Sequence, residues 1–337
     1  MEMNAFFNQQ AKTAGMRYIE SFYDGLRVAD TYLVKTKNQA VTKNGKEYLN
    51  VTLQDRTGQV DAKVWEPNSP GIAEFDVLDY VYVEGNVTVY NGTNQLSIQR
   101  LRVAKEGSYN PADYFPVSAR PVEEMQQELK ADIASVKNPY LHSVLQKIFV
   151  DDTAFYEEFC KHSAAKSVHH GFVGGLLEHT LSVTAICDYF SKHYPDLKRD
   201  LLITAALCHD IGKVTELTSF PRNDYSDEGQ LIGHIVIGYQ KVMNTIDTIP
   251  DFPKTLTAEL GHCILAHHGE LEYGSPKKPA LMEAMALSFA DNVDAKLETM
   301  REALHQADHA GKGSDNGGWI GFNKLIDSNL RKTSDLM

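Results

Sequence analysis

The sequence predicts two folded domains, a small all-β barrel followed by an all-helical domain. Residues 26–105 alternate apolar and polar side chains between turn signals, which is typical of short strands. From Val122 onward, apolar residues instead recur at three- and four-residue spacing, which indicates helices. A proline-containing polar segment at residues 106–121 separates the two patterns and predicts a fairly stiff linker.

Five strands fit the first domain, which we assign to residues 16–105. Asn44-Gly45 and Asn91-Gly92 are hairpin signals, and the second of them joins a long fourth strand to a fifth. This order fits a closed Greek-key barrel of the OB type, a fold that commonly binds single strands through aromatic platforms and a basic groove. The predicted strands are residues 31–35, 48–53, 59–65, 80–90 and 95–103.

The net charge of −12 argues against indiscriminate nucleic-acid binding, but the charge is unevenly spread. Residues 31–65 carry six basic against three acidic side chains, which is compatible with binding a phosphate backbone. Aromatic residues also favour strands for packing, so each candidate platform has a structural alternative as barrel core. The residues that we expect to contact nucleic acid are Lys35, Lys37, Lys46, Tyr48, Lys63, Trp65 and Tyr90.

The second domain, residues 122–310, shows helical periodicity with strand signals nearly absent, so we expect it to be all-α. Residues 1–15 lack an apolar core and are predicted to be a flexible extension rather than a secretory signal. The tail, residues 311–337, combines a flexible Gly-rich stretch with a small apolar patch for docking on the body or on another subunit. The predicted helices are residues 122–136, 139–150, 153–162, 176–194, 197–207, 232–246, 254–267 and 281–305.

The four cysteines are widely spaced and form no CxxC motif, which favours buried thiols in a reducing compartment over disulfides or a zinc knuckle. No apolar run approaches the ~20 residues that span a membrane. We therefore expect a cytoplasmic protein with no membrane partner. The cysteines are Cys160, Cys187, Cys208 and Cys263.

His209-Asp210 stands at the end of an apolar run, residues 201–207. Burying an adjacent imidazole and carboxylate is costly unless something compensates for it, and a divalent metal would do so because both side chains are metal ligands. Lys213 lies about one helical turn beyond Asp210 and can point a cation toward an anion that the metal holds.

Further candidate ligands occur in apolar or glycine-flanked settings of the helical domain. A single histidine on a helix is more often a packed core or surface residue than a ligand, so the whole set is better evidence for a metal site than any one residue. The candidate ligands are more than a single four-coordinate zinc site can use. They suit two ions, of Mn, Fe, Co, Ni or Zn, that share a bridging carboxylate. The candidate ligands are His179, His209, Asp210, His234, His267, His268 and Asp291.

The candidate ligands and their spacing resemble the motifs of a known family. The pattern His179…His209-Asp210…Asp291 resembles the signature of the HD-domain metal phosphohydrolases, and His234 with His267-His268 resembles members that hold two metals. Together with an OB-like domain, further motifs make residues 16–310 similar to the YhaM family of bacterial 3′–5′ exoribonucleases. Those motifs are His169-His170, Gly174-Gly175-Leu-Leu-Glu-His-Thr, Gly229-Gln-Leu-Ile-Gly-His234 and His267-His-Gly269…Gly274-Ser-Pro276.

The resemblance implies an HD-domain helical bundle that cleaves single-stranded RNA to nucleoside 5′-monophosphates, with single-stranded DNA open as a further substrate. It implies Mn²⁺ as the activator and Asp210 as a bridge between two ions. Lys213 would neutralise a phosphate oxygen. His170 would contact the scissile phosphate or the leaving 3′-oxygen, or else only cap the Gly-rich turn. One ion would be held by His179, His209, Asp210 and Asp291, and the other by Asp210, His234 and His267, His268 or both.

Two other functions remain open from the sequence. The first is an HD-domain phosphodiesterase or phosphohydrolase of small nucleotides, with the barrel as a regulator. The second is an RNA-binding or scaffold protein with a structural metal, which the number of ligands and Lys213 disfavour. Homo-oligomer formation is left open as well.

Overall fold

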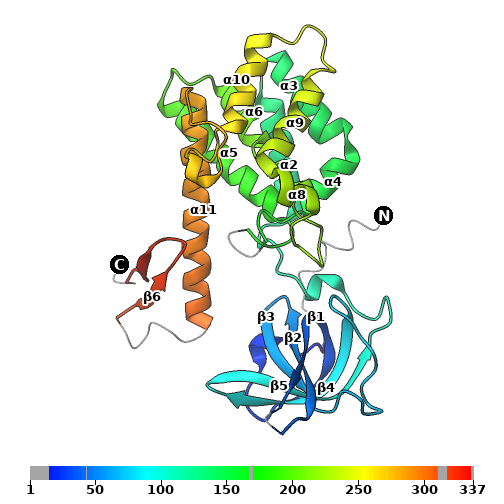
Figure 1. The fold of residues 1–337 in the computed structure, drawn as a ribbon. Coiled ribbons are helices and arrows are strands. Elements are labelled where there is room, and N and C mark those ends of the chain that lie inside the picture. The colour runs from blue at the N-terminus through cyan, green and yellow to red at the C-terminus, as the bar shows by residue number, and fades with distance from the viewer. Residues whose placement is uncertain (1–14, 43, 167–169, 310–316, 335–337) are drawn as a thin grey trace. The chain divides into compact units, whose positions relative to one another are not determined.

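The structure is a computed structural model that describes residues 15–42, 44–166, 170–309 and 317–334. The chain folds into two compact units, Met1–Val117 and Ser118–Met337 (Figure 1). The predicted extension, residues 1–15, lies outside the described residues apart from Gly15. No described helix is long and apolar enough to cross a membrane.

The first unit is the predicted five-stranded barrel, closed in the order β1-β2-β3-β5-β4. Only β3 and β5 pair in parallel, and the other neighbours are antiparallel. The first strand is longer than predicted because its early part pairs with β4 and its later part with β2, with a register shift between Val34 and Thr36. The strands are β1 (Arg27–Val41), β2 (Glu47–Asp55), β3 (Gly58–Val64), β4 (Tyr80–Tyr90) and β5 (Thr93–Val103).

Alternation along the strands separates the barrel core from its outer face. On β2, Val51 and Leu53 are buried, whereas Tyr48, Asn50 and Thr52, which point to the other face of the strand, are partly exposed. The barrel closes tightly at Gly85, where a Cβ atom would lie 2.4 Å from the Ser97 carbonyl oxygen. Because side chains alternate along each strand, the polar and aromatic residues of β2 and β3 lie on the outer face of the barrel.

The segment that we predicted as a linker, residues 106–121, is largely packed. Tyr114 is buried, its carbonyl oxygen accepts a hydrogen bond from Gln54 Nε2 at 3.0 Å, and the Arg56 N–H donates to the Asp113 carbonyl at 2.9 Å. Tyr109 stacks on Tyr80 with ring centroids 3.9 Å apart. The barrel unit thus extends through this segment to Val117.

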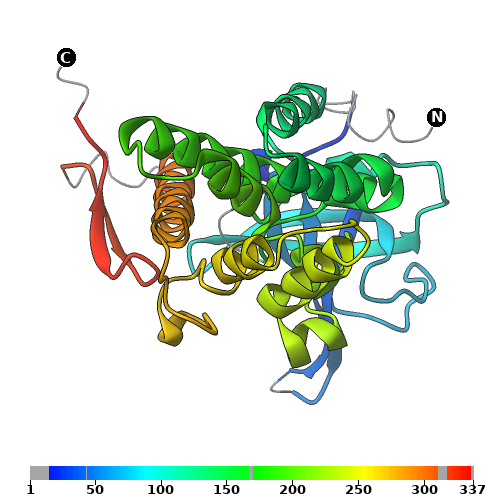
Figure 2. The same ribbon diagram turned by 90° about the horizontal axis from the view of Figure 1, so that it is seen from above.

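The second unit is a bundle of helices built around α6, which contacts α3, α5, α10 and α11 (Figures 1 and 2). Every residue of α6 from Leu201 to Cys208 is buried, which explains the apolar run in the sequence. Residues 147–151 form a π-helical turn after α3. The α-helices are α2 (Val122–Ser135), α3 (Pro139–Gln146), α4 (Thr153–Lys161), α5 (Gly175–His193), α6 (Arg199–Cys208), α7 (Lys213–Glu216), α8 (Asp227–Ile232), α9 (His234–Ile246), α10 (Lys254–Leu265) and α11 (Met282–His309).

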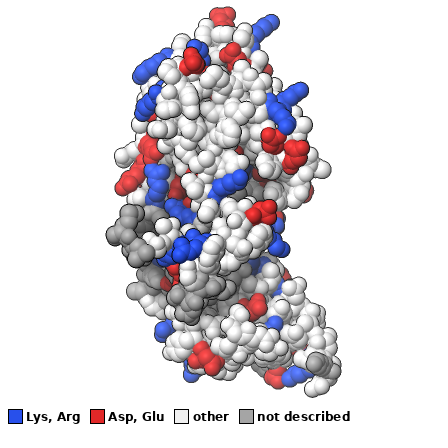
Figure 3. Space-filling model, turned by 90° about the vertical axis from the view of Figure 1, so that its left-hand side faces the viewer, with Lys and Arg blue, Asp and Glu red and all other residues white. Residues whose placement is uncertain are grey.

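The long helix α11 has a buried and an exposed face. Ala284, Leu287 and Ala290 are buried against the bundle, whereas Phe289 and Leu297 are exposed. On the side of the helical unit that Figure 3 shows, charged side chains lie mainly toward the margins. The buried face of α11 is the one that supplies Asp291 to the site described below.

The tail, residues 311–337, contains two short strands that the sequence did not predict, whereas the predicted all-α region, residues 122–310, is helical. Trp319–Asn323 (β6) and Ser328–Arg331 (β7) form an antiparallel hairpin, with Asp327 in the left-handed region at φ +56°. Its strands are too short for a clear alternation, so the pattern was not detected. Leu330 is buried, but the apolar side chains Trp319 and Phe322 remain exposed. The Gly-rich stretch, residues 310–316, lies outside the described residues.

Candidate metal centre and nucleic-acid surface

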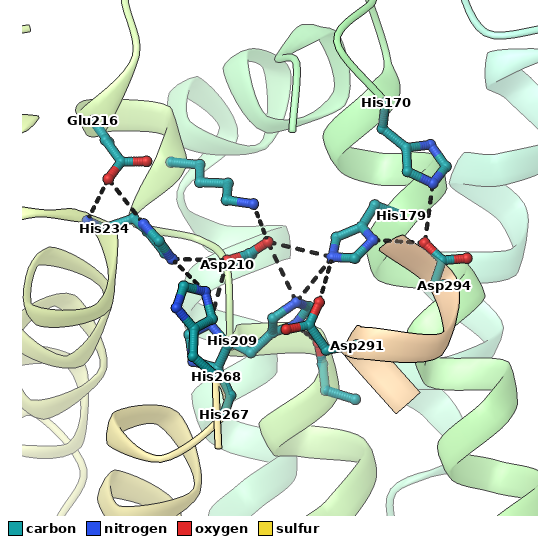
Figure 4. Close-up of polar contacts among 12 residues, drawn as sticks. His170, His179, His209, Asp210, Glu216, His234, His267, His268, Asp291 and Asp294 are labelled. Carbon is teal, nitrogen blue, oxygen red and sulfur yellow. Dashed lines mark hydrogen bonds and ion pairs between the residues drawn. The ribbon is translucent and has the colours of Figure 1, made fainter. Parts of the chain in front are cut away.

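The seven predicted ligands lie together at one place in the helical unit, although they come from distant parts of the chain (Figure 4). Most of them stand at helix ends, where the backbone direction changes and a side chain can turn inward. His209-Asp210 follows α6, His234 begins α9, and His267-His268 follows α10. The other two come from within helices, His179 from the early part of α5 and Asp291 from α11.

One group of ligand atoms, which we call the His209 triad, consists of His179, His209 and Asp291. The Nε2 atoms of His179 and His209 are 3.2 Å apart, and His179 Nε2 is 3.3 Å from Asp291 Oδ1. A second group, the His234 triad, consists of His234, His267 and His268, and the Nε2 atoms of His234 and His268 are 3.3 Å apart.

Asp210 lies between the two triads and presents one carboxylate oxygen to each. Its Oδ2 atom is 3.4 Å from Nε2 of both His179 and His209. Its Oδ1 atom is 3.5 Å from Nε2 of His234 and 3.6 Å from Nε2 of His267. This is the position that a carboxylate bridging two ions would occupy.

The hydrogen bonds of the histidines fix the ring nitrogen that faces the centre. In all five rings Nδ1 donates to an oxygen outside the centre, which leaves Nε2 directed inward. Metal-bound imidazoles usually show this pattern, in which the second nitrogen is held by a carbonyl or carboxylate. The acceptors are Asp294 for His179, the Ala206 carbonyl for His209, Glu216 for His234, the Ile264 carbonyl for His267 and the Tyr273 carbonyl for His268.

The residues present fit a divalent cation. Among the described residues, buried Asp210 Oδ1 and His267 Nε2 have no hydrogen-bond partner, although buried polar atoms are normally satisfied. The two atoms face each other, and Asp210 Oδ1 also faces His234 Nε2, whose ring donates through its other nitrogen. Imidazole nitrogen and carboxylate oxygen together suit Mn²⁺, Fe²⁺, Co²⁺, Ni²⁺ or Zn²⁺. A cation between them would satisfy both atoms at once.

The charges in the centre are arranged to keep Asp210 ionised. Burial alone would raise the pKa of Asp210, but Lys213 and His209 outweigh burial and hold that pKa well below the usual carboxyl range. Lys213 Nζ lies 2.7 Å from Asp210 Oδ2. Burial lowers the pKa of His267, so this ring is neutral, as a metal ligand must be.

Two glycines allow the chain to approach the centre closely. A Cβ atom on Gly212 would lie 2.0 Å from the His234 carbonyl oxygen, so only glycine lets the start of α9 pack against the turn after Asp210. A Cβ atom on Gly175 would lie equally close, 2.0 Å, to the His170 carbonyl oxygen. These contacts explain two glycines that stand near the ligands in the sequence.

His170 lies behind His179 and belongs to neither triad, although it forms a further group of possible ligand atoms with His179 and Asp294. His170 Nε2 lies 3.0 Å from Asp294 Oδ2, and the same oxygen accepts from His179 Nδ1 at 2.7 Å. His170 is buried and has a left-handed backbone with φ +60°, a strained conformation for a side chain of this kind. His169 lies outside the described residues.

Sequence reasoning missed two carboxylates, Asp294 and Glu216, that contact the ligands from outside. Asp294 follows Asp291 by three residues on α11, a spacing that puts both on one side of the helix and could have indicated its role. Glu216 ends the short helix α7, and nothing in the local sequence distinguishes it from an exposed helix acid.

Three of the barrel residues that we predicted to bind nucleic acid lie together. The rings of Tyr48 and Trp65 are 5.0 Å apart, and Lys63 Nζ lies 5.6 Å from the Tyr48 ring centroid. Lys63 also donates to Asn50, and Trp65 is 43% exposed, enough to leave part of its ring free for stacking. The cluster is therefore an aromatic and basic surface on the outer face of β2 and β3.

The other predicted barrel residues have different surroundings. Lys37 donates to the Phe75 carbonyl and lies 3.6 Å from Asp76, while Lys46 is paired with Glu66 at 2.9 Å. Lys35 is half-buried at the register shift of β1. Tyr90 pairs with Thr93 at the tip of the β4–β5 hairpin, whereas Val64 of β3 pairs with Ile98, which lies about 16 Å farther along β5.

Two parts of the chain match known domain families. Residues 32–104 match the OB-fold nucleic acid binding domain, and residues 176–296 match the HD domain. The chain therefore belongs to the class of proteins that combine an OB-fold nucleic acid binding domain with an HD domain.

Relatives that match most of the chain identify its family. The 3′-5′ exoribonuclease YhaM of Bacillus velezensis is 34% identical over 284 residues, which are 84% of this chain and 89% of the relative. The protein of the same name from Bacillus subtilis matches with the same 34% identity and coverage. A solved OB-fold domain of replication protein A from Methanococcus maripaludis is 18% identical and covers 28% of this chain and 98% of its own, with a TM-score of 0.22. The chain belongs to the YhaM family.

Proposed function

We propose that this protein is a metal-dependent 3′–5′ exoribonuclease that shortens single-stranded RNA and releases nucleoside 5′-monophosphates. The observation that carries the proposal is the position of Asp210 between two triads of potential ligands, with Lys213 against one of its oxygens. Membership of the YhaM family, whose named relatives are 3′–5′ exoribonucleases, supports the same activity.

The ligand geometry favours two ions, and the nitrogen and oxygen donors suit Mn²⁺, Fe²⁺, Co²⁺, Ni²⁺ or Zn²⁺, of which the resemblance to the YhaM family favours Mn²⁺. His179, His209, Asp210 and Asp291 would hold one, and Asp210, His234, His267 and His268 the other. When bound, divalent ions supply Lewis acidity to the phosphodiester and lower the pKa of the attacking water.

The side chains of this protein then account for the rest of the reaction. Hydrolysis forms a bond between the water oxygen and phosphorus and breaks the bond from phosphorus to the 3′-oxygen, which leaves with its electron pair and takes up a proton. Lys213 stays charged because Asp210 outweighs the effect of burial and raises its pKa. Its ammonium neutralises a non-bridging phosphate oxygen as charge develops there.

The barrel would hold the strand upstream of the cleaved bond. Tyr48 and Trp65 offer stacking surfaces to any base, and Lys63 offers a cation to the phosphate backbone. Such a surface binds without strong sequence preference, which suits an enzyme that must process successive nucleotides of any sequence.

A comparison of linear with circular RNA tests this function. We expect purified protein with Mn²⁺ to shorten a linear single-stranded 20-mer with a free 3′ end and to leave a circular RNA of the same sequence intact. Cleavage of both would contradict an exonuclease. Turnover of dinucleotides without turnover of the 20-mer would instead indicate a phosphodiesterase of small nucleotides with a regulatory barrel.

A further inference from the structure

The five inward-facing histidines are held in two different ways. His209, His267 and His268 donate to main-chain carbonyl oxygens no more than five residues away in the sequence. His179 and His234 instead donate to carboxylates from other elements, 115 and 18 residues away respectively. Each triad therefore contains one histidine whose orientation depends on a distant acidic side chain.

Of the two triads, Glu216 has hydrogen bonds only to the His234 triad in the described structure. Its Oε1 atom accepts from His234 Nδ1 at 2.8 Å and from the His234 backbone N–H at 2.9 Å. The His234 backbone N–H is the first N–H of α9 and has no hydrogen-bond partner within that helix. One oxygen thus fixes both the ring and the backbone of this ligand, and Glu216 is almost completely buried at 8% exposure.

Of the two triads, Asp294 has hydrogen bonds only to the His209 triad, as far as the described residues show. Its Oδ2 atom accepts from His179 Nδ1 at 2.7 Å and from His170 Nε2 at 3.0 Å, and its Oδ1 atom accepts from the Ser182 hydroxyl. The carboxylate is itself held by Ser182 from the next turn of α5, so it has little freedom to move. It ties helix α11 to the ligand on α5 at the centre of the site.

We propose that Glu216 and Asp294 are positioning residues that each fix one triad, so that the affinity of each metal ion is set by a different carboxylate. This inference rests on the two-ion site of the proposed function. A charged acceptor on Nδ1 selects the tautomer with a free Nε2, orients the ring and makes it a stronger ligand. Because neither carboxylate has a hydrogen bond to the other triad in the described part of the chain, loss of one should weaken one ion and spare the other.

Amide substitutions separate charge from shape. In Glu216→Gln the side-chain oxygen can still accept from both N–H groups of His234, so only the charge is removed. In Asp294→Asn one oxygen can still accept from His179 and His170 while the amide donates to the Ser182 hydroxyl. Loss of such an outer partner typically lowers metal affinity about 10- to 100-fold. Glu283→Gln is the matched control, because Glu283 is also a buried carboxylate of α11 but bonds, among the residues that the structure describes, only the Lys198 N–H.

The test is calorimetric titration of metal-free full-length protein with Mn²⁺. We expect two binding events in the wild type, one weakened about 10- to 100-fold in Glu216→Gln and the other in Asp294→Asn. The ligand variants His234→Ala and His209→Ala identify the events, since Glu216→Gln must affect the same event as His234→Ala and Asp294→Asn the same as His209→Ala. Thermal melts confirm that each variant is folded.

Several outcomes would overturn the inference. These are a single event in the wild type, equal weakening of both events by one amide variant, unchanged events in both variants, and an effect of Glu283→Gln of the same size. His170→Ala must leave both events in place, since an effect equal to that of Asp294→Asn would mean that Asp294 acts through His170. Two unshifted events in a protein that still shortens RNA would refute the positioning role and leave the proposed function intact.

Discussion

Asp210 Oδ1 and His267 Nε2 lie 3.6 Å apart inside the helical unit, and neither atom has a hydrogen-bond partner among the described residues. The two residues are almost fully buried, with 2% and 0% exposure. An unsatisfied buried polar group costs about 1–3 kcal/mol. A fold that keeps two such atoms face to face is most stable when a cation lies between them.

Metal binding should therefore stabilise the folded protein. A ligand that binds only the native state at 100 times its Kd adds about 2.7 kcal/mol to the free energy of unfolding. We expect Mn²⁺ to raise the Tm of chelator-treated protein by several degrees. Differential scanning calorimetry with and without Mn²⁺ measures the shift. Asp210→Ala should abolish it, and an equal shift in that variant would place the ions elsewhere.

Lys213 should affect turnover rather than metal binding. Its ammonium lies 2.7 Å from Asp210 Oδ2 but contacts none of the histidines of either triad in the described structure. We expect Lys213→Met to lower kcat about 10²- to 10³-fold, the usual loss when one group that stabilises developing charge is removed. Metal content, measured by mass spectrometry, should stay near the wild-type value. Loss of metal in parallel with activity would mean that Lys213 instead maintains the site.

The barrel cluster should govern the binding of long substrates. Loss of one stacking side chain costs about 1–3 kcal/mol, so Trp65→Ala should weaken binding of a single-stranded 20-mer about 5- to 150-fold. Cleavage of a dinucleotide should change little. Binding of the 20-mer should also weaken as salt increases, and less steeply in Lys63→Gln because one phosphate contact is lost. Tyr189→Ala removes an aromatic ring of the helical unit that is more exposed than Trp65, 63% against 43%, and an effect as large as that of Trp65→Ala would argue against the cluster.

The approach of α9 to the metal centre should depend on Gly212. A Cβ atom there would meet the His234 carbonyl oxygen at 2.0 Å, a backbone contact that no side-chain rotation relieves. We expect Gly212→Ala to lower the free energy of unfolding by about 1–3 kcal/mol or more and to reduce Mn²⁺ affinity, because His234 must move. Urea unfolding and metal titration measure both effects. A variant with wild-type stability and affinity would refute this close contact.

Asp132 should reduce stability at neutral and higher pH. Burial, followed by the charges of Glu128 and Asp188, raises its pKa to about 6. Because the folded-state pKa lies above the unfolded value, the stabilising contribution is complete below about pH 4 and is lost as the pH rises through 6. Asp132→Asn should therefore add about 1 kcal/mol at pH 8, after allowance for solvent screening, and little at pH 4. Urea unfolding at the two pH values decides, and an equal gain at both would contradict a charge effect.

The ligands themselves could be predicted from the sequence because each carries a local signal. His209-Asp210 follows an apolar helix, and His234 and His267-His268 stand beside glycines at helix ends. Glu216 has no such signal and Asp294 has just its spacing from Asp291, because the role of both depends on contacts between elements that only the folded chain brings together. Sequence reasoning also missed the short strands β6 and β7 and the packing of Tyr114 on the barrel. Each of these features depends on few residues, too few to leave a pattern in the sequence.

In the barrel, too, the sequence predicted the strands but not the positions of their side chains relative to one another. Alternation predicted all five strands, yet it could not tell which basic residues share a surface. Lys63 contacts the Tyr48 ring, whereas Lys37 turns toward Phe75 and Asp76 after the register shift in β1. Such a shift reverses the face on which a side chain lies, and the sequence gives little indication of it.

The most direct test of the central claim, that the two triads around Asp210 drive cleavage from the 3′ end, uses RNA labelled at its 5′ end. With Mn²⁺, the wild-type protein should convert a single-stranded 20-mer into a ladder of labelled products that shorten from the 3′ end. His209→Ala and Asp210→Ala, each shown to be folded by circular dichroism, should leave the RNA intact. A ladder that persists in these variants, or that forms in the presence of excess chelator, would contradict the account.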